Sequence, residues 1–398
     1  MFILKNHIDK KGIIVVAAIF ISLFCSYPYT FPRFFPTPPL TIVIVFELVS
    51  LALVCLTLKR KKTLPKTFAI ICLLQILIFV ALAIWHRDIF YLMRFALYVV
   101  LTYFSLYIVH NTIGISKFVT INNVWITIQA VLSVVGFVLI VANIIHPLMV
   151  YYFEDSYGVD YFYGITTTNA IIGIIPRIAG YFDEPGAFAQ WGMYALVLNK
   201  ISPCYNKRIE LILIFGLVFT FSLAYFLQLT LYLVLFNYKY IKKFVLVLVV
   251  LAGLVVISSK LIPEDSDLYF LTLRRFDMNA ETNRDEPSKV AKAFFYKNPI
   301  LGAGYTKLAD SGVYFWDNPY ETLASSGIVG AFALYLPLIV ILLRYRKKSA
   351  LPAVIILSVG YLQRPFHIQY IHYLMMYLLF LDCYYLNMRV SIKKKYEE

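Results

Sequence analysis

Long apolar runs dominate this sequence and recur from residue 12 to residue 388. A helix needs about 20 predominantly apolar residues to cross about 30 Å of hydrocarbon. Hydrophobic residues make up 61% of the 398 residues and charged residues only 15%, which is too apolar for a soluble fold of this size. The sequence therefore predicts an all-α, polytopic membrane protein in which residues 1–398 form a single integral membrane domain.

The apolar runs are the predicted membrane spans. They cover residues 12–27, 40–58, 67–85, 89–109, 122–146, 187–201, 209–238, 244–262, 319–343, 350–363 and 368–388. Run 209–238 is too long for one ordinary span, and basic residues flank it on both sides. Because basic residues favour the inner side of a membrane, we expect a hairpin of two short spans whose turn, near residues 220–225, is recessed below the outer surface. This arrangement gives about twelve transmembrane helices with both termini in the cytoplasm.

Charge and cysteine usage exclude several classes of protein. The formal net charge is +14, but the basic residues lie in short blocks between apolar runs instead of along one stripe, which follows the positive-inside rule and does not indicate nucleic-acid binding. The first run has no small-residue cleavage site after it, so we expect an uncleaved first span. The cysteines are widely spaced and are predicted to be buried, inert thiols without a disulfide framework: Cys25, Cys55, Cys72, Cys204 and Cys383.

Two polar segments, 147–186 and 263–318, become large external loops in this topology. Both are too long to be simple connections, and long loops on a rigid scaffold usually carry function. In the second loop, Asp285-Glu286-Pro287 is followed by Val290, Ala293 and Phe294. This pattern predicts a short amphipathic helix that begins at the proline and lies along the membrane surface.

The external loops contain the arginines that we consider as ligands of a diphosphate: Arg177, Arg274, Arg275 and Arg284. Guanidinium groups donate in a planar, bidentate fashion to phosphate and stay charged when partly desolvated, so clustered arginines at a membrane face can clamp a lipid diphosphate. Alternatively, the arginines of the second loop pair with the acidic residues beside them. Arg177 can likewise be a snorkelling anchor at the membrane interface.

Two carboxylates lie near predicted span boundaries. Glu184 directly precedes Pro185-Gly186, a pair that can start a helix at the interface. A carboxylate in a poorly solvated position can act as a general base, and it can equally cap the helix. Glu321 lies just inside span 319–343, where charged residues are rare and mostly functional or paired.

The second loop closes with aromatic and polar residues at 314–320. Asp317 and Asn318 beside aromatic rings are typical of a sugar-binding surface, because ring faces stack on sugars while amides and carboxylates bond hydroxyl groups; an interfacial aromatic belt is the alternative. Arg364 and His367, near the outer ends of the last two spans, complete the candidate substrate-binding residues. We expect neither a metal nor a cofactor, because no His or carboxylate motif has ligand spacing.

Three segments of the chain resemble the bacterial O-antigen polymerase and O-antigen ligase family of polysaccharide-assembling membrane proteins. They are Arg177-x-x-Gly180-x-x-x-Glu184-Pro185-Gly186, the run 298–304 (Asn-Pro-Ile-Leu-Gly-Ala-Gly), and Asn318 to Gly330, which is similar to a "His-Asn…Gly-x-x-Gly" segment of the family. The resemblance covers roughly residues 165–345. Asp317 stands where ligases typically have His, which favours the polymerase branch. Leu223 follows Thr220-Phe221-Ser222, where relatives often continue Ser-Arg.

The resemblance implies inverting, metal-independent glycosyl transfer by a GT-C-like membrane enzyme on the outer face of the bacterial inner membrane, the periplasmic or exterior side. The donor would be a growing glycan on undecaprenyl diphosphate and the acceptor a lipid-linked repeat unit of O-antigen, lipopolysaccharide, capsule or exopolysaccharide. Arg177 and Arg284 would stabilise the leaving diphosphate, and Glu184 would be the general base, with Asp317 or Glu321 in reserve. Membrane lipid, a flippase and a chain-length regulator are the expected partners.

Two alternatives remain open from the sequence. An O-antigen ligase would transfer the glycan to a lipid or other acceptor, and a secondary transporter or polysaccharide flippase would not be an enzyme at all. A transporter is expected to bury its polar groups near the membrane midplane on broken helices. In this sequence the polar groups are concentrated in the external loops.

Overall fold

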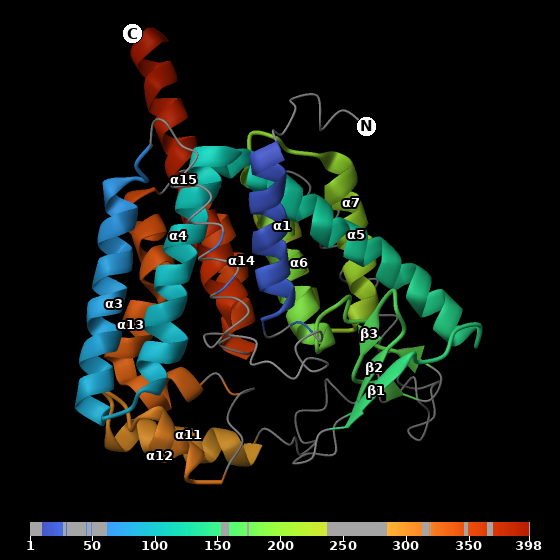
Figure 1. Cartoon of the computed structure of the whole chain (residues 1–398), viewed down its shortest axis with the longest axis horizontal. Coiled ribbons are helices and arrows are strands. Elements are labelled where there is room, and N and C mark those ends of the chain that lie inside the picture. The colour runs from blue at the N-terminus through green and yellow to red at the C-terminus, as the bar shows by residue number, and fades with distance from the viewer. Residues whose placement is uncertain are drawn as a thin grey trace.

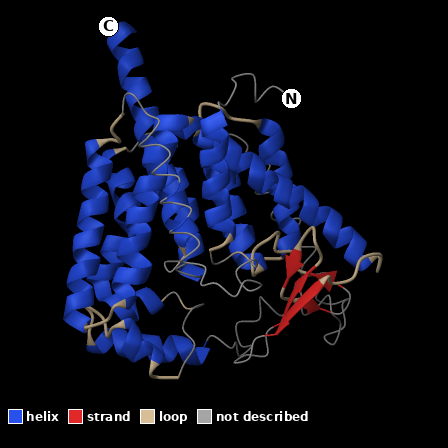
Figure 2. Cartoon of the chain, in the orientation of Figure 1, coloured by secondary structure: helices blue, strands red, loops and turns tan. Residues whose placement is uncertain are grey.

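The structure, a computed structural model, describes residues 10–26, 29, 45, 49, 62–152, 159–172, 175–236, 285–312, 318, 320–345, 349–363 and 369–397. Within these ranges most residues are helical, and the strands are confined to one loop (Figure 2). The mainly helical fold predicted from the sequence is therefore confirmed, whereas the strands were not predicted.

The helices of the first half of the chain form one bundle together with those of the second half (Figure 1). The helices of the first half are α1 (Lys10–Phe24), α3 (Lys66–His86), the π-helical turn η2 (Tyr91–Ala96) that continues as α4 (Leu97–Thr112), α5 (Ile115–Val141) and α6 (Pro185–Ile201). The helices of the second half are α7 (Lys207–Gly216), the 3-10 turn η3 (Leu217–Thr220), α8 (Leu223–Phe236), α11 (Asp285–Lys297), α12 (Tyr305–Ala309), α13 (Glu321–Arg344), α14 (Ala350–Gln363) and α15 (Tyr370–Glu397).

Among the described residues, four helices are long and apolar enough to cross a membrane, namely 66–86, 91–112, 115–141 and 321–344. Their length and composition are those expected of membrane-crossing helices. Helix α5 begins at Ile115, before the predicted first residue 122. The chain enters the helix at Gly114, which has a φ of 84°, and Lys117 therefore lies in the first helical turn. The predicted spans 40–58 and 244–262 lie outside the described residues.

The bundle has two chemically different ends (Figure 1). One end, which we call the loop end, carries the strands of the first external loop together with α11 and α12. The other, the basic end, contains the starts of α1, α5 and α7 and the C-terminal part of α15. Helix α11 lies across the loop end (Figure 1) and contacts α13.

The run 209–238 reverses direction, as predicted. Helices α7 and α8 are antiparallel: the Tyr225 hydroxyl donates to the Ile214 carbonyl at 2.5 Å, and the Tyr232 hydroxyl donates to Glu210 Oε1 at 2.5 Å. Phe221 makes the turn with a φ of 47°. A positive φ is costly for a bulky residue and persists only where surrounding contacts impose it.

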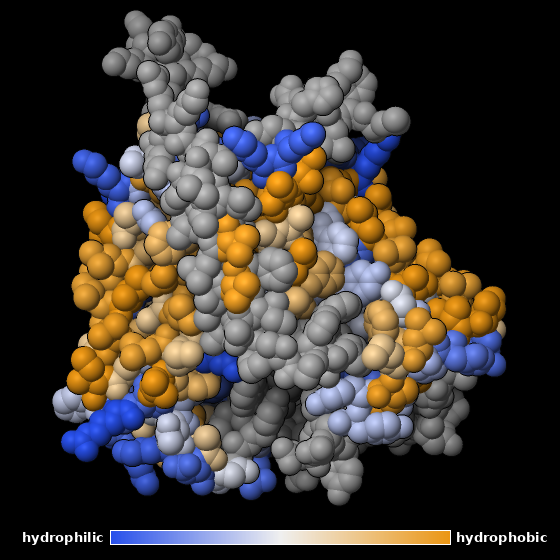
Figure 3. Space-filling view, viewed as in Figure 1, coloured by the Kyte–Doolittle hydropathy of each residue, from blue (hydrophilic) through white to orange (hydrophobic). Residues whose placement is uncertain are grey.

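Helices α6 and α15 form the centre of the bundle. Every residue from 187 to 199 and from 369 to 383 is buried, and α6 contacts α5, α7, α8, α14 and α15. Helices α3 and α5, in contrast, expose apolar side chains such as Leu73, Leu77, Val135 and Val138. These helices give the flanks of the bundle their apolar surface (Figure 3), which is the property expected of lipid-facing helices.

The first external loop folds into two small antiparallel sheets. Strands β1 (Met149–Tyr152), β2 (Val159–Phe162) and β3 (Thr167–Thr168) form one sheet in that order, with Met149 opposite Phe162, and β4 (Ile171–Ile172) pairs with β5 (Ile175–Pro176). Aromatic and β-branched residues, which favour strands, are frequent in all five segments. The all-α prediction is therefore incomplete for this loop.

The amphipathic helix predicted in the second external loop is confirmed as α11. Its buried side, however, differs from the predicted one: Ala291 is buried and Val290 and Phe294 pack beside it, whereas Ala293 is exposed. The buried neighbours are Ala303, Leu308 and Ala324. The helix therefore packs on protein through this face, against α12 and the start of α13.

The prediction that all cysteines are buried is wrong for Cys204. This residue is exposed in the turn between α6 and α7, while Cys25, Cys72 and Cys383 are buried. The turn is polar and lies beyond the apolar helices, so its side chains reach the surface.

Candidate active site

The segment that contains Arg177 lies beside strand β3. The Thr167 N–H donates to the Gly180 carbonyl at 2.6 Å, and the Ala179 N–H donates to the Thr167 carbonyl at 2.9 Å. The Thr168 hydroxyl donates to the Arg177 carbonyl at 2.6 Å. These bonds satisfy backbone groups that would otherwise be buried without partners, so they hold the first motif segment in a defined path.

Arg177 joins this loop to the turn of the α7–α8 hairpin. Its Nε donates to the Thr220 carbonyl at 3.2 Å and its NH2 group to the Phe221 carbonyl at 3.5 Å, and the adjacent Ile178 N–H donates to the Phe219 carbonyl at 3.2 Å. Carbonyls at the end of a helix need such external donors. The half-buried Arg177 is thus a structural clamp on the hairpin turn, and its guanidinium lies at the loop end of the bundle.

Glu184 occupies the N-cap position of α6. Its backbone is extended, with φ −146° and ψ 153°, and Pro185 follows at the first helical position, but its side chain makes no capping hydrogen bond. Glu184 thus occupies the capping position considered from the sequence, but through its backbone and not through a side-chain bond. The Glu184 carboxylate lies close to Gly186: a Cβ atom added to Gly186 would be 3.1 Å from Glu184 Oε1. The half-buried carboxylate is thus placed at the positive end of the α6 dipole.

Helix α13 is broken at Gly327, which has a φ of 63° and a ψ of −167°. The segment from Pro299 to Gly304 crosses this break and forms backbone hydrogen bonds on both sides of it. The amides of Ala303 and Gly304 donate to the carbonyls of Ala324 and Ser325 at 2.8 and 2.9 Å, and the amides of Ile328 and Val329 donate to the carbonyls of Pro299 and Ile300 at 2.9 and 3.1 Å. We call residues 299–304 the crossing segment.

Glycines permit this crossing. A Cβ atom on Gly302 would lie 2.3 Å from the Ser325 backbone, and one on Gly327 would lie 2.3 Å from the Ile300 carbonyl oxygen. Gly302 also has a φ of 74°, which an L-residue rarely adopts. Two of the three segments that carry the family resemblance are therefore hydrogen-bonded to each other at a place where their glycines allow the backbones to approach closely.

The turn between α3 and η2 supports the crossing segment. His86 Nε2 donates to the Leu301 carbonyl at 2.9 Å, and Asp88 Oδ2 accepts from the Thr306 N–H at 2.9 Å. The Tyr91 hydroxyl donates to the Ser325 carbonyl at 2.8 Å. These three residues were not predicted from the sequence, although the turn His86-Arg87-Asp88 between two apolar runs could have indicated them.

Asn318 and Glu321 begin α13 at the loop end. Asn318 is 1% exposed, and its Oδ1 accepts from the Tyr320 N–H at 2.9 Å. Glu321 is 4% exposed and lies in the first turn of α13. Burial, and after it the charge of the Glu321 carboxylate, raises the pKa of Tyr305 well above its ordinary value, so Tyr305 is a neutral phenol at neutral pH.

The described candidates lie at the loop end in two groups (Figure 1). Arg177 and Glu184 belong to the first external loop, and Asn318 and Glu321 belong to the start of α13. The remaining candidates lie outside the part of the chain that the structure describes: Arg274, Arg275, Arg284, Asp317, Arg364 and His367. No three His, Cys, Asp or Glu side chains of the described residues converge as metal ligands would.

Comparison with known proteins gives no assignment. No protein-family model matches the chain. No curated protein sequence matches it either.

Proposed function

We propose that this protein is a polymerase of lipid-linked polysaccharide repeat units that catalyses inverting, metal-independent glycosyl transfer at the loop end of the bundle. The observation that most supports the proposal is the docking of the crossing segment on the break in α13 at Gly327. The two segments, 298–304 and Asn318 to Gly330, carry two of the three resembling motifs. The third motif, with Arg177 and Glu184, lies at the same end (Figure 1).

The leaving group of the proposed reaction is a diphosphate, which requires fixed cations. Arg177 meets this requirement because its bonds to the carbonyls of Thr220 and Phe221 fix the plane of the guanidinium, and a guanidinium has five N–H donors in a rigid fork. Preorganised donors of this kind are usually the largest contribution to transition-state stabilisation. Arg284 is the second proposed cation.

The acceptor hydroxyl requires a general base. Glu184 is half-buried and lies at the start of α6, so its carboxylate is partly accessible to a sugar hydroxyl, as a general base must be. Glu321 is 4% exposed and is harder for a sugar hydroxyl to reach. These differences favour Glu184 as the base and Glu321 as a residue that positions the loop end.

The charge asymmetry of the bundle supports an outward-facing site. At the basic end, Lys10, Lys62, Lys117, Lys207 and Arg208 lie near helix termini. At the loop end, the lysines of α11 and α12 are accompanied by the acidic residues Glu286, Asp310 and Glu321. The positive-inside rule assigns such an end to the cytoplasm. The loop end would then face the periplasm or the exterior, where undecaprenyl-diphosphate-linked repeats are available.

Deletion of the gene, followed by electrophoresis of extracted surface glycan, tests the proposal. A polymerase deletion leaves glycan capped with one repeat unit. Absence of glycan from its final acceptor would indicate a ligase instead, and repeats trapped inside the cell would indicate a flippase. Either of the last two results would reject polymerisation as the function.

A further inference from the structure

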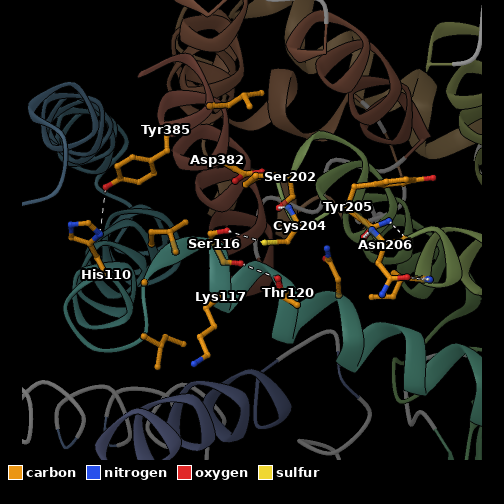
Figure 4. Close-up of a pocket in the computed structure, with 18 of the residues that line it drawn as sticks. His110, Ser116, Lys117, Thr120, Ser202, Cys204, Tyr205, Asn206, Asp382 and Tyr385 are labelled. Atoms are coloured by element: carbon orange, nitrogen blue, oxygen red, sulfur yellow. Dashed lines mark hydrogen bonds between the residues drawn. The ribbon is translucent and has the colours of Figure 1, made fainter. Parts of the chain in front are cut away.

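A cavity of about 800 Å³ opens at the basic end, opposite to the candidate active site (Figure 4). It lies where the end of α4, the start of α5, the turn between α6 and α7, and α15 meet. Sites for small molecules have volumes of about 300–1,000 Å³. The cavity can therefore hold a ligand, and the proposed glycosyl transfer does not use it.

Positive charge is concentrated at the rim of this cavity. Lys62 and Lys117 line it, and Asn111 fixes Lys62 to α4: Asn111 Oδ1 accepts from the Lys62 N–H at 2.7 Å, and its Nδ2 donates to the Lys62 carbonyl at 3.0 Å. The start of α5 lines the same cavity at Gly114, where no side chain caps the helix. The first N–H groups of a helix attract anions. The lysines and the start of α5 therefore both favour an anionic ligand.

Uncharged polar groups of the cavity add hydrogen-bonding capacity. Asn123 lines the cavity and is 2% exposed, and its Oδ1 has no hydrogen-bond partner within the described ranges. A buried polar atom left unbonded costs about 1–3 kcal/mol, so a ligand hydroxyl that donates to it would be stabilised. The hydroxyl groups of Ser116 and Ser202 also line the cavity.

The acidic groups near the cavity do not cancel its cationic side. Asp382 is buried and lines the cavity on α15, whereas Lys117 extends away from it (Figure 4). Glu210, on α7, accepts a bond of 2.9 Å from Lys200 and is bonded by the hydroxyls of Tyr205 and Tyr232. An anion is therefore expected on the side of Lys62 and the start of α5.

We propose that this cavity binds a phosphate group, and that apolar side chains of the same cavity accommodate the body that carries it. Ile113, Ile115, Ile209 and Leu386 provide these apolar contacts. Basic pockets between helices at the cytoplasmic side of membranes are suited to anionic lipid headgroups. Anionic phospholipid and free phosphate share the chemistry that the cavity recognises, and they are separated by the experiment below.

Cys204 provides the readout, because it is exposed, lines the cavity, and its Sγ lies 3.8 Å from Ser116 Oγ. The full chain in phosphatidylcholine nanodiscs is treated with a maleimide, with and without added phosphatidylglycerol or inorganic phosphate, and the Cys204→Ala variant gives the background. We expect alkylation to slow about tenfold at roughly ten times Kd, since protection follows 1 + [L]/Kd. Lys62→Ala/Lys117→Ala should remove the protection, and Lys307→Ala on α12 should keep it.

The outcomes separate the two sources of phosphate. Protection by phosphatidylglycerol alone supports a lipid site, and protection by inorganic phosphate, with sulfate-matched ionic strength, supports a site for free phosphate. Equal alkylation rates under all conditions would overturn the proposal, as would full protection in the double-lysine variant. Lys62→Gln, a single change at an exposed residue, should weaken protection without affecting the fold and guards against misfolding of the double variant.

Discussion

Substituting the glycines of the crossing segment tests how the two resembling motifs are held together. In Gly302→Ala, the new Cβ would lie 2.3 Å from the Ser325 backbone, which is too close for any side chain, so the crossing segment must move away from α13. Gly312→Ala is the matched control. Gly312 has a similar φ of 69°, but nothing lies within 4 Å of its Cβ position.

The expected cost follows from the contacts that are lost. Both variants place alanine at a positive φ, which costs about 1–2 kcal/mol. Only Gly302→Ala also breaks the backbone bonds donated by Ala303, Gly304, Ile328 and Val329, each worth about 1 kcal/mol net. The crossing segment of Gly302→Ala should therefore be destabilised by about 4 kcal/mol more than that of Gly312→Ala.

Hydrogen exchange in detergent measures this difference directly. A loss of about 4 kcal/mol corresponds to roughly 10³-fold faster exchange of the four crossing amides, at about 1.4 kcal/mol per factor of ten. Amides at the centre of α6 should exchange as slowly as in the wild type, which checks that the bundle is intact. Equal exchange at Ala303 and Gly304 in the two variants would refute the crossing geometry.

Three further substitutions test other parts of the account. Arg177→Lys should lower the polymerisation rate about 10²–10³-fold at unchanged membrane level, because an ammonium cannot replace the guanidinium fork; wild-type glycan length would make Arg177 an anchor only. Glu184→Gln should abolish elongation while leaving Tm unchanged, and retained activity would exclude Glu184 as the base. Glu210→Ala should lower the free energy of unfolding by about 3–5 kcal/mol because its bonded partner Lys200 loses its counter-charge, whereas the exposed Glu286→Ala should change it by less than about 0.5 kcal/mol.

Features that depend on local composition could be predicted from the sequence. The apolar run 350–363 coincides with α14 (Ala350–Gln363), because an uninterrupted apolar run favours a buried helix; with 14 residues, α14 is not one of the four helices long enough to cross a membrane. The reversal within 209–238 followed from the basic residues on both of its sides. The helix at 285–297 followed from its proline and its apolar spacing, although a shift of its buried side made the prediction for Ala293 wrong.

Features that depend on distant partners could not be predicted in this way. Gly302 and Gly327 were part of recognisable motifs, but nothing local shows that they meet. The role of His86 depends on Leu301, which lies 215 residues further along the chain, and the bond from Arg177 depends on where the hairpin turn lies. Tertiary contacts of this kind determine the arrangement of the candidate site, whereas residue types determine only its chemistry.

Reconstitution of the purified protein with synthetic undecaprenyl-diphosphate-linked repeat units tests the central claim most directly. The products are separated by electrophoresis after incubation in proteoliposomes with excess EDTA. A ladder of chains longer than one repeat, present with the wild type and absent with Glu184→Gln, is the predicted result. A single unextended repeat with the wild-type protein, under conditions in which its membrane insertion and Tm are normal, would contradict the account.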